Sequence, residues 1–163
     1  MKINLYAFKA IYLHEMDRFR RTLTQSVLSP VLTTSLYFIV FGSVIGGYVE
    51  KIDGISYGSY IVPGLLMLTL LTQSISNTSF GIFFPKFNGT IYEILAAPIS
   101  TLEVVLAFVG AGATKTLIVS IIIFITSLFF VDVQVKYPLL MIFLLILVAF
   151  TFALFGFLIG LMS

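Results

Sequence analysis

Two short motifs in this chain of 163 residues begin like catalytic signatures, and each lacks a residue that its chemistry requires. The run from Gly110 to Thr116 resembles a phosphate-binding loop, but such a loop needs glycine directly before its lysine, where Thr114 stands. His14 and Glu15 begin like a zinc-protease motif, yet Arg18 occupies the position of the second histidine. We therefore expect a chain that is not an enzyme and holds no metal or cofactor of its own.

Lys115 is the single charge inside a long apolar stretch that extends from Val104 to Val131. If that stretch is a membrane helix, Lys115 lies roughly 16 Å from Val104 at about 1.5 Å per residue, near the middle of a bilayer. An unpaired ammonium there costs about 2.5–3.5 kcal/mol, so the side chain should snorkel or face a protein interior. Two interpretations stay open: Lys115 contacts a substrate or a charged partner, or it only extends toward the lipid headgroups.

The segment between the second and third apolar stretches carries two capping boxes. In such a box a hydroxyl caps the start of a helix, and a carboxylate three residues later reaches back to the first backbone N–H. Thr90 and Glu93 have this spacing, and Ser100 and Glu103 repeat it. The pattern predicts two helix starts within a short distance.

Two helix breakers separate these starts. Gly89 loosens the backbone before the first box, and Pro98 disfavours helical geometry at the residue before it. We expect a short separate helix from Ile91 to Ala96 and a new long helix that begins near Thr101. The residues alone leave two interpretations of the short helix, a plain linker and a docking element.

The elements that must position these residues are four long uncharged stretches. A bilayer core needs roughly 20 apolar residues of helix, and a barrel is excluded because the stretches are apolar on every face. The composition, 60% hydrophobic and 10% charged, supports the same class. We predict an all-α polytopic membrane protein with one transmembrane domain over residues 1–163 and spans at 27–49, 60–84, 104–131 and 138–162.

The residues before the first span predict an interfacial helix over 2–21. Apolar residues recur there at intervals of three and four, which is typical of a helix with one apolar face lying in the headgroup region. It either anchors the chain to the membrane surface or also contacts a cytoplasmic partner. The apolar face is formed by Leu5, Phe8, Tyr12, Met16, Phe19 and Leu23.

Lysine and arginine predict the orientation of the chain in the membrane. Cytoplasmic loops carry an excess of these residues. Two of them, Lys51 and Lys136, fall in one set of loops, and six fall in the other set: Lys2, Lys9, Arg18, Arg20, Arg21 and Lys86. Both ends of the chain should therefore be cytoplasmic. The net charge of +2 forms no basic face, so we expect no nucleic-acid partner.

The run from Lys86 to Ser100, with Glu103 after it, resembles the hallmark segment of ABC transporter type-2 permeases, where a Gly-Thr, an acidic residue, a Leu and a Pro-x-Ser recur in that order. Tyr60 to Leu65 resembles the second span of the same family. The resemblance implies a permease subunit of a bacterial inner-membrane exporter that forms a homodimer and works by alternating access. It also implies separate ATPase subunits that bind ATP and Mg.

The same resemblance implies roles for particular residues. Coupling to the ATPase would fall on the segment 90–97, with Thr90, Ile91, Tyr92, Glu93 and Leu95. Independently of the resemblance, the charge of Lys115 within a span makes it a candidate for the translocation path. The exported substrate is open, because a lipid-linked glycan, a drug, a lipid or a peptide all fit an apolar path. The alternative function is a membrane anchor for a cytoplasmic complex, structural or regulatory, that transports nothing.

The chain departs from the family in one respect. Members usually have six spans, and only four are predicted before Ser163. We therefore expect a fragment or a truncated product of a longer permease.

The predicted orientation can be tested with single cysteines, because the natural chain has none. Cysteines at Asp53 and Gln134 should react with an impermeant thiol reagent in intact cells, since both positions lie in predicted outer loops. A cysteine at Asn88 should react only after the cells are opened. Labelling at Asn88 in intact cells would reverse the predicted topology.

Overall fold

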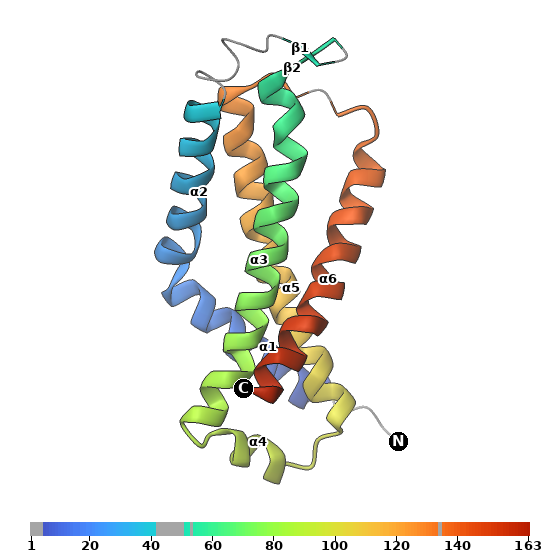
Figure 1. Ribbon diagram of the computed structural model, residues 1–163. Helices are drawn as coiled ribbons and strands as arrows, with labels where there is room; N and C mark the ends of the chain where they lie inside the picture. The colour runs from blue at the N-terminus through green and yellow to red at the C-terminus, as the bar shows by residue number, and fades with distance from the viewer. Residues whose placement is uncertain (1–4, 42–50, 53, 134) are drawn as a thin grey trace.

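The computed structural model describes residues 5–41, 51, 52, 54–133 and 135–163, and the chain is almost entirely helical within them. Four helices stand side by side (Figure 1): α2 (Leu23–Ile39), α3 (Tyr57–Phe87), α5 (Thr101–Phe130) and α6 (Pro138–Met162). Helix α1 (Leu5–Arg21) crosses the bundle obliquely in the half that holds the short helix α4 (Ile91–Ala96), and a two-stranded hairpin lies at the opposite end. The predicted all-α membrane fold is confirmed.

The first two helices, α1 (Leu5–Arg21) and α2 (Leu23–Ile39), meet at a corner formed by Thr22. The backbone N–H of Thr22 donates to the carbonyls of Arg18 and Phe19 at 3.3 and 3.1 Å. Its hydroxyl also donates to the Arg18 carbonyl, at 3.2 Å. These bonds satisfy carbonyls at the end of α1 and allow the chain to change direction without a long loop.

Among the described residues, three helices are long and apolar enough to cross a membrane: α3 (Tyr57–Phe87), α5 (Thr101–Phe130) and α6 (Pro138–Met162). They contain 31, 30 and 25 residues, whereas a bilayer core needs about 20. α3 continues through Pro63 and Pro85, which membrane helices tolerate where neighbouring groups satisfy the freed carbonyls.

The first predicted span, 27–49, overlaps α2 only in part. α2 contains 17 residues, and positions 42–50 lie outside the described part of the chain. The number of spans and their membrane boundaries therefore stay predictions. Asp53 and Gln134, where cysteines would test the orientation, also lie outside the described residues.

The hairpin lies at the end of the bundle opposite α4. Strands β1 (Lys51–Ile52) and β2 (Ile55–Ser56) pair antiparallel, and Gly54 in the turn has a φ of 82°, which glycine adopts without strain. Beside the hairpin, the Ser59 hydroxyl donates to the carbonyl of Asp132 at 2.9 Å. This bond joins the start of α3 to the segment that follows α5.

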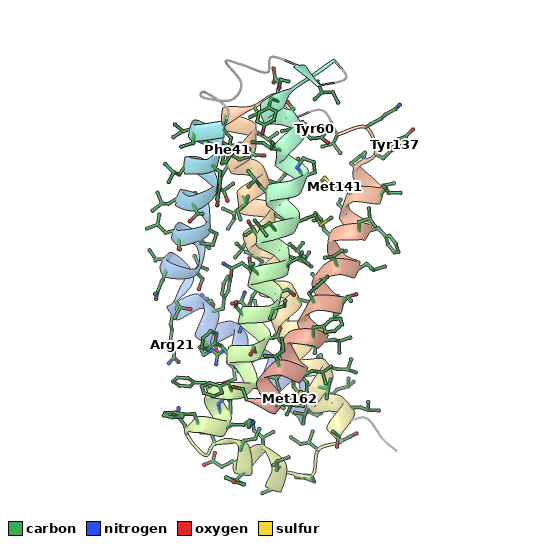
Figure 2. The ribbon with its side chains drawn as sticks, viewed as in Figure 1. Arg21, Phe41, Tyr60, Tyr137, Met141 and Met162 are labelled. Carbon is green, nitrogen blue, oxygen red and sulfur yellow. The ribbon has the colours of Figure 1, made fainter. Side chains whose placement is uncertain are left out.

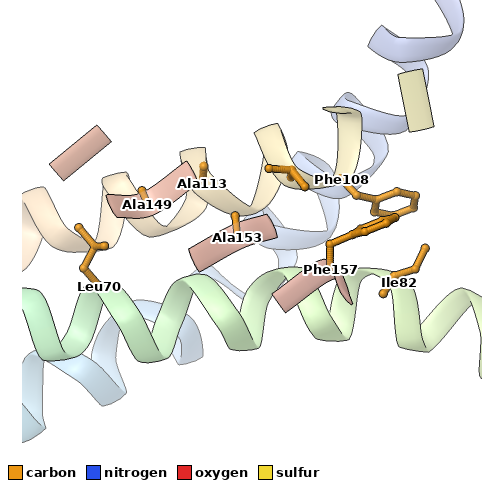
Figure 3. Close-up of a cluster of buried hydrophobic side chains, with 8 residues drawn as sticks. Leu70, Ile82, Phe108, Ala113, Ala149, Ala153 and Phe157 are labelled. Carbon is orange, nitrogen blue, oxygen red and sulfur yellow. The ribbon is translucent and has the colours of Figure 1, made fainter. Parts of the chain in front are cut away.

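A cluster of buried apolar side chains joins α3, α5 and α6. Small residues on α5 and α6 let the helices approach, and two rings, Phe108 and Phe157, meet with their centroids 6.3 Å apart (Figure 3). Polar contacts also join α3 to α6: the Ser74 hydroxyl donates to the Ala149 carbonyl at 2.7 Å, and the Lys86 ammonium donates to the Leu161 carbonyl at 2.7 Å. The cluster consists of Leu70, Ile82, Phe108, Val109, Ala113, Ala149, Ala153 and Phe157.

Two glycines of α6 bring its backbone against the backbone of α3. A Cβ added at Gly156 would lie 2.5 Å from the carbonyl oxygen of Ile75, and one added at Gly160 would lie 2.7 Å from that of Ser79. Small residues at such positions allow membrane helices to pack closely. The spacing of Gly156 and Gly160 therefore serves packing within one chain.

This contact predicts that Gly156→Ala destabilises the protein. The new methyl group has no space beside the Ile75 carbonyl, and overpacking of this kind costs about 1–3 kcal/mol. The midpoint of thermal unfolding in detergent should fall, because α6 must move away from α3.

Gly110→Ala is the matched control. An added Cβ there meets no packed neighbour within 4 Å, and alanine favours a helix over glycine by about 1 kcal/mol. The unfolding midpoint of this variant should stay constant or rise. Equal decreases in the two variants would contradict the close contact between α3 and α6.

Candidate functional site

The segment between α3 and α5 folds into a short separate helix, α4 (Ile91–Ala96), as the breakers predicted. Gly89 has a φ of 77°, which turns the chain after α3. Ala97 is extended, with φ −73° and ψ 148°, as expected for a residue before proline. α4 lies at the end of the bundle away from the hairpin, between the ends of α3 and α5 (Figure 1).

The first predicted capping box, at Thr90 and Glu93, is wrong. Thr90 has helical backbone angles, φ −62° and ψ −19°, and its side chain makes no capping bond. Backbone carbonyls satisfy the first N–H groups instead, because Tyr92 donates to Gly89 at 3.2 Å and Glu93 donates to Thr90 at 3.1 Å. The Glu93 carboxylate therefore has no capping bond and lies exposed on α4.

The second predicted capping box, at Ser100 and Glu103, is confirmed, because each side chain bonds to the backbone of the other residue. The backbone N–H of Ser100 donates to Glu103 Oε2 at 3.0 Å, directly before the first turn of α5. Glu103 is also buried, so this start of α5 is firmly fixed. The two ends of the segment thus differ: α5 has a side-chain cap, whereas α4 starts on a glycine turn.

α4 has two faces with different surroundings. Ile91 and Ile94 are half-buried and pack against the apolar cluster of α3, α5 and α6. Tyr92 and Leu95 point away from the bundle, with exposed fractions of 73% and 69%. The helix therefore attaches to the core on one side and presents a ring and an aliphatic side chain on the other.

Lys115 does not stand alone in the structure. Its ammonium lies 2.7 Å from Oε2 of Glu15 on α1, and each side chain is only 3% exposed. Arg18 lies 2.9 Å from the same carboxylate oxygen and is 32% exposed. Lys115 thus faces the protein interior and has a charged partner within its own chain. A role in a translocation path stays a prediction.

Other contacts surround this ion pair. One residue before Lys115, Thr114 accepts a hydrogen bond of 3.0 Å from the Tyr12 hydroxyl, so α1 reaches α5 at two successive positions. Gly81 of α3 lies beside the carboxylate, since a Cβ added there would be 3.4 Å from Glu15 Oε2. The charged cluster therefore lies where α1, α3 and α5 meet.

Sequence reasoning missed Glu15 as the partner of Lys115. A signal was present, because Glu15 falls between Tyr12 and Phe19 on the apolar face of the predicted interfacial helix. A carboxylate on such a face requires a cation or several hydrogen-bond donors. The one charge within a predicted span, Lys115, was the matching candidate.

The motifs that resemble catalytic signatures have no catalytic geometry. Residues 110–116 lie within the continuous helix α5 and form no loop that could surround a phosphate. His14 is exposed on α1. Within residues 5–41, 51–52, 54–133 and 135–163, the side chains of His, Asp and Glu form no group of three or more that could hold a metal.

At the hairpin end, the structure has an open cavity of about 1220 Å³. It lies between the start of α3, the segment after α5 and the start of α6, where Figure 2 shows Tyr60, Tyr137 and Met141. The lining is mostly apolar and includes the charged residues Asp132 and Lys136. The short helix α4 and this cavity thus lie at opposite ends of the bundle.

A model of the ABC-2 type transporter family matches residues 6–163, nearly the whole chain. This chain belongs to the ABC-2 type transporter family. The inner membrane transport permease YadH of Escherichia coli K12 is 38% identical to it over 160 residues. YadH of Shigella flexneri matches with the same identity and coverage. No solved structure matches the chain.

The alignment with YadH covers 98% of this ABC-2 family chain but 62% of YadH. The chain thus spans less than two thirds of the length of that relative. Membership of the family confirms the resemblance seen in Lys86 to Ser100 and in Tyr60 to Leu65. In the structure, the first of these two segments contains α4 and the second lies in the first turns of α3.

Proposed function

We propose that this chain is part of a permease subunit of an ABC exporter in a bacterial inner membrane. Family membership and three helices able to span a membrane support this proposal. The permease would act as a homodimer with separate ATPase subunits that bind ATP and Mg. The chain would supply the membrane path and no chemistry of its own.

The observation that carries the proposal is the two-sided environment of α4. Its inner residues, Ile91 and Ile94, attach to the apolar cluster, while Tyr92, Glu93 and Leu95 are exposed. A tyrosine with an aliphatic neighbour and a nearby charge is typical of an anchor in a protein interface. We infer that this outer face is the docking surface for the ATPase.

The connections of α4 explain how docking could move the spans. α3 ends at Phe87 and α5 begins at Thr101, so both helices join α4 through a few residues. Gly89 and the extended Ala97 can absorb changes of backbone angle at the two joints. A displacement of α4 would then tilt α3 and α5 and open the path alternately to the two sides of the membrane.

The docking role predicts the effect of Tyr92→Ala, alone and combined with Glu93→Arg. Loss of an interface anchor usually costs about 1–4 kcal/mol, which is enough to release a transient subunit. The ATPase subunit, recognised by its phosphate-binding loop, should co-purify with the tagged full-length permease at a lower yield for Tyr92→Ala and should be absent for the double variant. Membrane abundance should not change.

Tyr137→Ala is the matched control for this experiment. Tyr137 is an exposed tyrosine, 64% accessible, at the opposite end of the bundle. Its removal takes away the same ring and should leave the ATPase bound. Normal recovery of the ATPase with the double variant at Tyr92 and Glu93 would refute the docking role of α4.

A further inference from the structure

The carboxylate of Glu15 forms ion pairs with two basic side chains. Its Oε2 lies 2.7 Å from Lys115 Nζ on α5 and 2.9 Å from an Arg18 nitrogen on its own helix, α1. The Glu15 and Lys115 side chains are almost fully buried, whereas Arg18 reaches the surface. The Glu15 to Lys115 contact is therefore the part of this cluster that joins two helices.

A buried ion pair resists separation of the helices that carry it. Moving α1 along α5 would leave the buried ammonium of Lys115 without its partner, which is strongly unfavourable, while Glu15 would keep Arg18 on its own helix. The hydrogen bond from Tyr12 to Thr114 would break in the same movement. Among the described residues, α1 packs mainly against α5 and makes only a small contact with α2.

We propose that Glu15 is a positioning residue of the transport cycle: through Lys115 it fixes α1 to α5, so that the two helices move as one body when α4 is displaced. The inference rests on the proposed function for the role of α4. It assigns to α1 a part in transmission in addition to its predicted place at the membrane surface.

The order of the elements supports this assignment. α4 leads into α5, whose start is fixed by the bond between Ser100 and Glu103. α1 leads into α2 through the tight corner at Thr22. A movement that enters α5 at Thr101 would therefore reach α1 through the ion pair, whereas α2 also packs directly against α5.

The experiment measures the separation of α1 and α5 by paired spin labels. The labels are attached to cysteines that replace two exposed residues, Asp17 on α1 and Leu106 on α5. Residues 1–163 contain no cysteine, and every cysteine elsewhere in the transporter is replaced first. The full-length transporter, with one labelled permease copy, is measured without nucleotide and after trapping with ATP and vanadate. For the natural sequence, the distance distribution should be narrow and the same in both states.

Lys115→Met should broaden the distance distribution between α1 and α5 in the detergent-solubilised permease without its ATPase. In the full-length transporter with its ATPase, the same variant should also allow this distance to change on trapping. Glu15 keeps Arg18 as a partner in this variant, so the carboxylate does not become an uncompensated charge. Lys115→Arg keeps the cation and should retain the narrow distribution. Arg18→Gln is the matched control, because it removes a cation from the same carboxylate but leaves the bond between α1 and α5.

Three outcomes would overturn the proposal. One is a change in the distance between α1 and α5 when the transporter with the natural Glu15 and Lys115 is trapped. This measurement does not depend on whether a variant of either residue folds. The others are an unchanged distribution in Lys115→Met and equal broadening in Arg18→Gln. The ATPase should co-purify normally with the Lys115→Met variant. Loss of ATPase co-purification in the Tyr92 variants therefore tests the proposed function separately from the role of Glu15.

Discussion

Close backbone contact between α3 and α6 is the constraint on which the described bundle depends. Lipid chains are as apolar as leucine, so membrane helices associate through packing and polar contacts more than through removal of apolar surface from water. Gly156 and Gly160 make this contact possible by leaving no side chain between the two backbones. The same principle acts between α3 and α5, where Gly112 accommodates the side chain of Thr78. Three helices thus form one packed unit, to which α1, α2 and α4 attach.

The attachment of α1 uses charge, in contrast to the small-residue packing of α3 and α6. An ion pair has a strict geometry, and its separation in an apolar environment is expensive, so it defines the position of α1 on α5 more sharply than exchangeable apolar contacts do. Arg18 adds a second cation near the surface, which compensates the carboxylate when Lys115 is absent. Packing therefore holds the central helices together, and the charge of Glu15 specifies where α1 lies.

The features predictable from the sequence are those set by local chemistry. Long apolar stretches predict α3, α5 and α6, and the glycine and proline around Ile91 to Ala96 predict α4 with its observed bounds. The capping box at Thr90 failed because backbone carbonyls can satisfy the same N–H groups, and spacing cannot distinguish the two solutions. The pairing of Glu15 with Lys115 joins residues that are far apart in the chain, so the spacing of apolar and polar residues along one helix cannot predict it. The partners of Gly156 and Gly160 require the tertiary structure for the same reason.

The position of α4 connects these separate observations. Its inner residues, Ile91 and Ile94, contact the cluster formed by α3, α5 and α6, so α4 is attached to the packed unit by side chains as well as by its two connections. In the proposed mechanism, a displacement of α4 would act on the packed helices through these contacts as well as through the joints at Gly89 and Ala97. Because α5 also carries Lys115, which contacts Glu15 of α1, the same proposed displacement would reach α1 as well.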